Sequence, residues 1–283
     1  APAGVVNVLT TDKPGELVQA ALADSRVRKL SFTGSTGVGR TLLKQAADRI
    51  VNTSLELGGN DPFLVLDDAD LDAAVAGAML AKTRNGGQAC TAANRFLVAE
   101  SVAAEFAAKL AAAMGALRMG AGTEENTQLG PMINARAVVG IADKVDRSVA
   151  AGARVLLGGD RPTTSGFFYP ATVLTDVPRD CPAATEEIFG PVAPIITVRD
   201  DDDAIAIANS TEMGLTGYVY TADLGRGLRV CERLQVGMVG LNRGLVSDPA
   251  APFGGVKQSG LGREGGYEGI DAYLETTYVA TDW

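Results

Sequence analysis

The sequence of 283 residues contains no histidine. A Ser-His-Asp triad and a Cys-His pair are therefore impossible within this chain. The zinc and copper sites that depend on imidazole ligands are excluded for the same reason. Any general base must be a carboxylate, a lysine or a thiolate. We predict no metal site.

Cysteine and basic residues are also scarce. The three cysteines, Cys90, Cys181 and Cys231, are far apart and form no C-x-x-C pair, which disfavours a disulfide framework and favours a reducing cytosol. Lysine and arginine number 25 against 34 acidic residues, and the net charge of −9 disfavours nucleic acid as a partner. The apolar stretch Leu71–Ala81 is too short to span a bilayer. We predict a cytoplasmic protein with no nucleic-acid or membrane partner.

Strand-like and helix-like segments alternate along most of the chain. Short apolar or β-branched runs predict strands at Val5–Leu9, Arg28–Phe32, Pro62–Leu66, Arg95–Ala99, Ala153–Leu157, Phe167–Leu174, Val192–Val198, Tyr218–Thr221, Met238–Asn242 and Tyr273–Thr281. Helical patterns lie between them, and Asp70 is placed to cap the helix that follows it. Residues 119–134 predict a long loop. This order predicts an α/β fold with mostly parallel sheets.

Two motifs carry candidate reactive groups. Glu56 lies between two leucines in LELGGN, and a carboxylate in apolar surroundings has a raised pKa that suits a general base. Cys90 follows a glycine pair in NGGQACT, where the start of a helix would lower the thiol pKa and supply oxyanion donors. Taken alone, the spacing favours a solvated glutamate at a strand end and a buried structural cysteine.

Three further motifs are rich in glycine or acidic residues. FTGSTGVG at 32–39 predicts a strand, a turn and a helix whose free N–H groups suit a phosphate, although it matches neither standard nucleotide fingerprint. EEIFGP at 186–191 places two carboxylates beside an aromatic ring, which suits ligand hydroxyls but equally a plain turn. PFGGVKQSG at 252–260 indicates tight backbone packing or close approach to a ligand.

In chain order, the series FTGST-x-VG, ELGGN, N-x-GQ-x-C, EEIFGP and PFGG-x-K-x-SG-x-GRE resembles the aldehyde dehydrogenase superfamily over essentially the whole sequence. The resemblance implies an α/β fold with a partial Rossmann-type cofactor domain, an α/β catalytic domain and a C-terminal oligomerisation strand. It assigns residues 1–57 to the cofactor domain, 58–249 to the catalytic domain, 250–270 to a return segment and 271–283 to the oligomerisation strand. A homo-oligomer, either dimer or tetramer, is therefore expected.

The resemblance also implies an NAD- or NADP-dependent mechanism. Cys90 attacks an aldehyde to form a thiohemiacetal, and its backbone N–H helps to stabilise the oxyanion. Loss of hydride leaves a thioester, which water activated by Glu56 hydrolyses to the acid. The implied cofactor contacts are Gly34 and Ser35 near the pyrophosphate, Leu57 and Phe189 beside the nicotinamide, and Glu187 at its ribose.

A closer resemblance is to succinate-semialdehyde and glutarate-semialdehyde dehydrogenases, through ELGGNDPF, KTRN ahead of GQAC, and GLVS ahead of APFGG. It implies that Arg84 and Ser247 bind a distal carboxylate of the aldehyde, since the arginine fork binds carboxylates bidentately. A structural arginine and a solvated serine remain the alternatives. Thr83 and Arg243 stand where phenylalanine and threonine are common, and Ala92 replaces the second cysteine of redox-switched members.

PAGVVNVLT resembles a segment well inside the family's cofactor domain. We therefore expect the chain to be the C-terminal portion of a longer enzyme, lacking an oxyanion-hole asparagine and a second carboxylate-binding arginine. One oxyanion donor is typically worth about 2 to 4 kcal/mol of barrier, so we expect weak activity from the chain alone. Two alternatives remain open, a non-catalytic binding or scaffold paralogue and a cysteine-dependent esterase.

Overall fold

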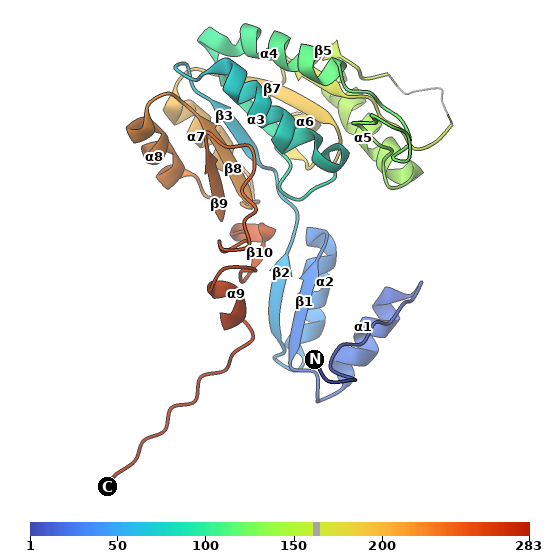
Figure 1. Ribbon diagram of the computed structural model, residues 1–283, viewed down its shortest axis with the longest axis vertical. Helices are drawn as coiled ribbons and strands as arrows, with labels where there is room; N and C mark the ends of the chain where they lie inside the picture. The colour runs from blue at the N-terminus through green and yellow to red at the C-terminus, as the bar shows by residue number, and fades with distance from the viewer. Residues whose placement is uncertain (161–164) are drawn as a thin grey trace.

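The computed structural model describes residues 1–160 and 165–283, which form a small sheet and a large sheet (Figure 1). The small sheet has the order β1-β2-β10, and the large sheet has the order β5-β6-β7-β4-β3-β8-β9. The strands of the small sheet are β1 Lys29–Thr33, β2 Asn52–Glu56 and β10 Gly260–Leu261. The strands of the large sheet are β3 Pro62–Val65, β4 Arg95–Ala99, β5 Arg154–Leu157, β6 Thr172–Thr175, β7 Val192–Val198, β8 Thr216–Tyr220 and β9 Met238–Leu241.

Helices connect most of these strands. They are α1 Pro14–Ala23, α2 Thr36–Ala47, α3 Leu71–Thr83, α4 Glu100–Gly115, α5 Ala135–Ala150, α6 Pro182–Thr185, α7 Asp201–Asn209, α8 Leu224–Arg233 and α9 Glu268–Asp271, with short 3-10 turns η1 Arg84–Gly87 and η2 Lys257–Ser259. Asp70 caps α3 as predicted, because its Oδ1 accepts from the N–H groups of Asp72 and Ala73 at 3.0 and 3.1 Å. None of the described helices is long and apolar enough to cross a membrane.

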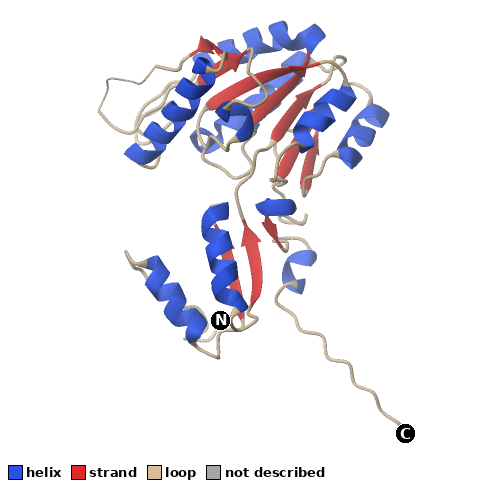
Figure 2. Ribbon diagram, turned by 180° about the vertical axis from the view of Figure 1, so that it is seen from behind, coloured by secondary structure: helices blue, strands red, loops and turns tan. Residues whose placement is uncertain are grey.

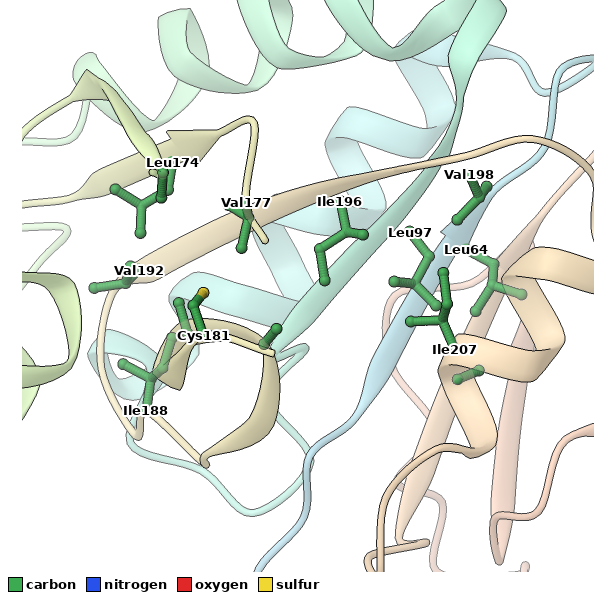
Figure 3. Close-up of a cluster of buried hydrophobic side chains, with 14 of the residues drawn as sticks. Leu64, Leu97, Leu174, Val177, Cys181, Ile188, Val192, Ile196, Val198 and Ile207 are labelled. Carbon is green, nitrogen blue, oxygen red and sulfur yellow. The ribbon is translucent and has the colours of Figure 1, made fainter. Parts of the chain in front are cut away.

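The centre of the large sheet is buried on both faces. On one face, Phe63 and Phe96 pack against α3 and α4, while on the other Leu64 and Leu97 pack in a core shared with α5, α7 and α8. Figure 3 shows part of the second core, in which Cys181 lies among aliphatic side chains. Burial on both faces explains why these strands read as continuous apolar runs in the sequence.

The pairing within the large sheet confirms the predicted parallel order. Among the described strands, β6, β7, β4, β3, β8 and β9 pair in parallel, and β5 joins the edge antiparallel to β6. In the small sheet β1 and β2 are parallel, and β10 returns from late in the chain to pair antiparallel with β2. Figure 2 shows the small sheet below the large one, with α1 and α2 beside it.

Three of the predicted strands differ from the structure by more than one or two residues at an end. Residues Val5–Leu9 form no strand, and their apolar side chains are exposed because no described strand lies beside them. The strand predicted at Phe167–Leu174 is shortened to β6, since Pro170 has no N–H to donate to a ladder. Tyr273 lies in the turn that follows α9, and residues 275–283 run as an extended segment away from the body without a described strand partner (Figures 1 and 2). Strand β2, which holds Glu56, was not predicted.

Candidate active site

The predicted reactive groups lie where the two sheets meet. The parallel strands β1 and β2 end at Thr33 and Glu56, and the chain then enters β3 of the large sheet at Pro62 (Figure 1). Cys90 precedes β4, so it lies at the amino-terminal edge of the large sheet. The site is therefore formed by the carboxyl ends of one parallel pair and the amino ends of another sheet.

Glu56 is buried, with 4% of its surface exposed. Burial raises its pKa from 4.5 to about 7, the charge of Glu264 adds to the rise, and Arg263 opposes it. Among the described residues, its Oε2 has no hydrogen-bond partner. A carboxyl of this kind exchanges a proton near neutral pH, so the prediction of a raised pKa is confirmed and Glu56 has the chemistry of a general base.

The loop that carries Cys90 depends on three left-handed residues. Asn85, Gly86 and Gly87 have φ values of +53°, +64° and +77°, which reverse the chain after α3. A side chain at Gly87 would overlap the carbonyl oxygen of Gly190, so only glycine fits there. Gln88 fastens the loop, because its Oε1 accepts from the backbone N–H of Ile133 at 2.8 Å.

Cys90 does not begin a helix, contrary to the prediction, because the chain passes from the glycine turn directly towards β4. Its thiol pKa is raised rather than lowered. Burial is the largest cause and the negative charge of Asp61 is the next, while hydrogen bonds from the backbone N–H groups of Thr91 and Cys90 act in the opposite direction. In this structure Cys90 is therefore a thiol at neutral pH.

Gly59 lies where the segment that follows Glu56 meets the loop that carries Cys90. A Cβ at Gly59 would lie 3.1 Å from the backbone oxygen of Cys90, so the segment that follows Glu56 packs directly on the cysteine loop. The charge of Glu56 also contributes to the raised pKa of Cys90. The Cys90 thiol and the Glu56 carboxyl are thus close enough to interact electrostatically.

The predicted pyrophosphate and nicotinamide residues gather beside Glu56. The backbone N–H of Gly34 donates to the Glu56 carbonyl at 3.0 Å, and Ser35 caps α2 by accepting from Val38 at 3.5 Å. Leu57 is buried against Gly39, where a Cβ would lie 2.6 Å from the leucine side chain. The end of strand β2 therefore packs directly against the start of helix α2.

Glu187 and Phe189 approach from the loop before β7. The carboxylate of Glu187 accepts a hydrogen bond from the backbone N–H of Gly59 at 3.1 Å. Burial raises the pKa of Glu187, and this hydrogen bond opposes the rise. Phe189 adopts a φ of +56° and remains 43% exposed. A carboxylate held beside the segment after Glu56, with an aromatic ring exposed nearby in the chain, suits a ligand that presents hydroxyls and a planar ring.

A dinucleotide fits the chemistry of this junction. Helix α2 has 12 residues and starts directly after a parallel strand, so its free N–H groups favour a phosphate. Beyond the neighbouring backbone of α2 itself, no atom lies within 4 Å of a Cβ built at Gly37, so this side of the first turn is open. The carboxyl ends of parallel strands are also where such ligands bind in α/β sheets.

The two predicted carboxylate-binding residues differ in how well they are held. Arg84 follows α3, and its Nη2 donates to Thr91 Oγ1 at 3.3 Å, which places the guanidinium beside the residue after Cys90. Ser247 is exposed, and no described hydrogen bond joins it to Arg84. Its loop packs on α3 through the close approach of Gly244 to the backbone of Gly77.

Several buried polar residues at the junction were missed by the sequence reasoning. Asp61 is fully buried with its pKa raised mainly by desolvation, and Lys82 is fully buried with its pKa lowered to about 7 for the same reason. Asn94 joins the segments by donating to Asn60 at 2.6 Å and accepting from Ile188 at 2.9 Å. The helical spacing contained a signal for Lys82, which follows Ala78 by four residues on the buried face of α3.

Fold and site together define an α/β protein in which a small three-stranded sheet meets a larger, mostly parallel sheet at the junction that carries Glu56 and Cys90. The chain belongs to the aldehyde dehydrogenase family, whose model matches residues 1–279.

Individual relatives extend this result. Succinate-semialdehyde dehydrogenase of Paenarthrobacter nicotinovorans is 55% identical over 98% of this chain and 62% of its own length. Glutarate-semialdehyde dehydrogenase of Pseudomonas putida is 50% identical over 98% of this chain and 57% of its own length. A crystal structure of succinate-semialdehyde dehydrogenase from Burkholderia pseudomallei superposes with a TM-score of 0.94 at 50% identity, over 96% of this chain and 56% of that one. The chain thus spans about three fifths of the length of the curated relatives it matches.

Proposed function

We propose that the protein takes part in the NAD- or NADP-dependent oxidation of an aldehyde with a distal carboxylate, succinic semialdehyde in the first place, to the carboxylic acid. The observation that carries this proposal is the junction of Glu56 and Cys90, where a buried carboxyl with a pKa of about 7 lies within electrostatic range of a partly buried thiol. The names of the relatives support the class of substrate.

In the proposed reaction Glu56 first accepts the thiol proton of Cys90. The thiolate sulfur adds to the aldehyde carbon, and the carbonyl oxygen becomes an oxyanion that the Cys90 N–H stabilises. Hydride leaves that carbon, and the carbon–sulfur bond remains as a thioester. Glu56, after releasing its proton, activates a water molecule, whose attack breaks the carbon–sulfur bond and frees the acid and the thiolate.

The cofactor-binding roles rest on the residues around β2. A nicotinamide dinucleotide, when bound, supplies the acceptor for the hydride. Gly34 and Ser35 would hold the pyrophosphate at the start of α2, and Leu57 and Phe189 would border the nicotinamide. Glu187 would bind ribose hydroxyls, because its carboxylate is already oriented by Gly59.

The substrate carboxylate is assigned to Arg84 and Ser247. Arg84 is the better supported of the two, since its hydrogen bond to Thr91 places the cation near Cys90. We also propose the division into a cofactor part at 1–57, a catalytic part at 58–249, a return segment at 250–270 and an oligomerisation strand at 271–283. A homo-oligomer in the cytoplasm completes the proposal.

The test follows reduced nicotinamide after succinic semialdehyde is added to the protein with NAD or with NADP. The sequence predicts weak turnover for the 283 residues, so the primary readout is the formation of the first equivalent of reduced nicotinamide per protein chain. Cys90→Ser should form none. Glu56→Gln should slow formation of the first equivalent, because the Cys90 thiol loses its proton acceptor, and the thioester that does form should persist as an acyl adduct on Cys90 that intact-mass measurement detects. Absence of both reduced nicotinamide and acyl adduct with either cofactor would contradict the proposal.

A further inference from the structure

Thr91, the residue after Cys90, connects Arg84 to the large sheet. It is buried, with 4% of its surface exposed. Its hydroxyl accepts a hydrogen bond from Arg84 Nη2 at 3.3 Å, and its carbonyl accepts one from Tyr218 Oη at 2.7 Å. One residue therefore ties an exposed guanidinium to strand β8.

The anchor at the other end of this connection is rigid. Tyr218 is 1% exposed, and its ring lies 5.7 Å from the ring of Phe63 within the core between the sheet and helices α3 and α4. Interiors packed at this density leave a side chain little freedom. The position of Thr91 is thus set by the core of the sheet.

The free end of the connection is available to an anion. None of the ion pairs in the described part of the chain involves Arg84, and its hydrogen bond to Thr91 uses one of the five N–H donors of the guanidinium. The hydrogen bond to Thr91 restrains the exposed Arg84 side chain, which has therefore already lost part of the freedom that binding would otherwise remove. The remaining donors can then accept a carboxylate with two parallel hydrogen bonds.

We propose that Thr91 is a positioning residue for substrate recognition: its hydroxyl holds the Arg84 guanidinium at a set distance from the Cys90 sulfur and so selects aldehydes whose carboxylate lies a few carbons from the carbonyl. This inference rests on the proposed function, because it assumes that Cys90 adds to an aldehyde. It assigns discrimination between charged and neutral aldehydes to the residue beside the nucleophile.

The experiment compares two aldehydes of the same carbon number, succinic semialdehyde and butanal, which differ in the carboxylate. Each adds reversibly to Cys90 and protects it from alkylation by iodoacetamide, which peptide mass spectrometry measures at that residue. The ratio of the two protection constants reports the preference for the carboxylate. Normalising to the alkylation rate without aldehyde removes any change in thiol reactivity.

Thr91→Val keeps the shape and the backbone carbonyl but removes the hydroxyl, and it should reduce the preference on the order of three- to tenfold. Thr91→Ser should retain the preference, which separates the hydroxyl from packing. Thr41→Val, the same change on an exposed threonine of α2, is the matched control and should leave the ratio unchanged. Tyr218→Phe releases the Thr91 carbonyl and should lower the ratio in the same direction, which keeps the test valid should Thr91→Val not fold.

The outcomes separate the two proposals. Protection by neither aldehyde, or equal protection by both in the unaltered protein, overturns the proposed substrate and this inference with it. Loss of the preference in Arg84→Met but not in Thr91→Val or Tyr218→Phe overturns the role of Thr91 and leaves the proposed function standing. Equal loss in Thr91→Val and Thr91→Ser also overturns it, because the hydroxyl would then not be the group responsible.

Discussion

Replacing Glu56 with glutamine keeps the size of the buried side chain and removes its ability to ionise. The pKa of Glu56 rises from 4.5 to about 7, mainly because the carboxylate is taken out of water and secondarily because of Glu264. Each pKa unit corresponds to about 1.4 kcal/mol, so the folded state pays about 3 kcal/mol for the ionised side chain. Glutamine avoids that cost at every pH.

The sign of the effect follows from proton binding. Below the unfolded pKa of 4.5 the carboxyl is protonated in both states and contributes no difference. Between 4.5 and about 7 the unfolded chain releases the proton while the folded protein keeps it, so the free energy of unfolding falls as pH rises. Glu56→Gln should therefore match the unaltered protein at about pH 4 and exceed it by about 3 kcal/mol at about pH 8.

Urea unfolding followed by far-ultraviolet circular dichroism at a series of pH values measures this difference. Glu264→Gln is the control that leaves Glu56 in place. Removing the neighbouring charge should lower the pKa of Glu56 and narrow the window in which stability is lost. A stability difference between Glu56→Gln and the unaltered protein that does not change with pH would refute the reasoning, because the carboxyl would then be ionised equally easily in both states.

Three further predictions concern Cys90 and its loop. Asp61→Asn removes a negative charge that raises the thiol pKa, so Cys90 should react faster with iodoacetamide at about pH 8, as peptide mass spectrometry measures; an unchanged rate would contradict the electrostatic role of Asp61. Gly87→Ala places a side chain at a φ of +77° against Gly190 and should lower the free energy of urea unfolding by about 2 kcal/mol or more. Gly37→Ala, in open space on α2, is the control and should change it by less than about 1 kcal/mol. Similar costs for both would show that the turn does not require glycine. Hydrolysis of p-nitrophenyl acetate without cofactor should disappear in Cys90→Ala, as release of p-nitrophenol reports, and hydrolysis that persists would come from another nucleophile.

Much of the fold was predictable because its strands and helices follow local patterns. Strands β4 and β7 have the predicted bounds, since each is a short apolar run between polar or glycine-containing segments. The strand expected at Val5–Leu9 failed because β-branched residues form a strand only when another strand supplies hydrogen bonds. Strand β2 was missed because its polar sequence NTSLE lacks the apolar alternation of a typical strand.

The sequence predicted which residues form the candidate site better than it predicted their protonation and burial. The residue types identified Glu56 and Cys90, and the raised pKa of Glu56 agrees with its apolar neighbours in the sequence. The predicted direction of the Cys90 pKa shift was wrong, because the shift depends first on burial and then on the charge of Asp61, 29 positions earlier, and not on a helix start. The burial of Lys82 and Arg95 was not predicted, because charged residues are usually exposed and only tertiary contacts show the exceptions.

By itself, the sequence determined the α/β order, the absence of imidazole chemistry and the presence of a cysteine and a glutamate in the motifs of the aldehyde dehydrogenase family. These features depend on residue identity and on periodicities of a few residues, which a chain carries locally. The tertiary structure alone decided that Cys90 is a partly buried thiol whose pKa is raised, that Lys82 and Asp61 are fully buried, and that Thr91 joins Arg84 to Tyr218. Those features arise from desolvation and from contacts between segments distant in the sequence, which exist only once the chain has folded.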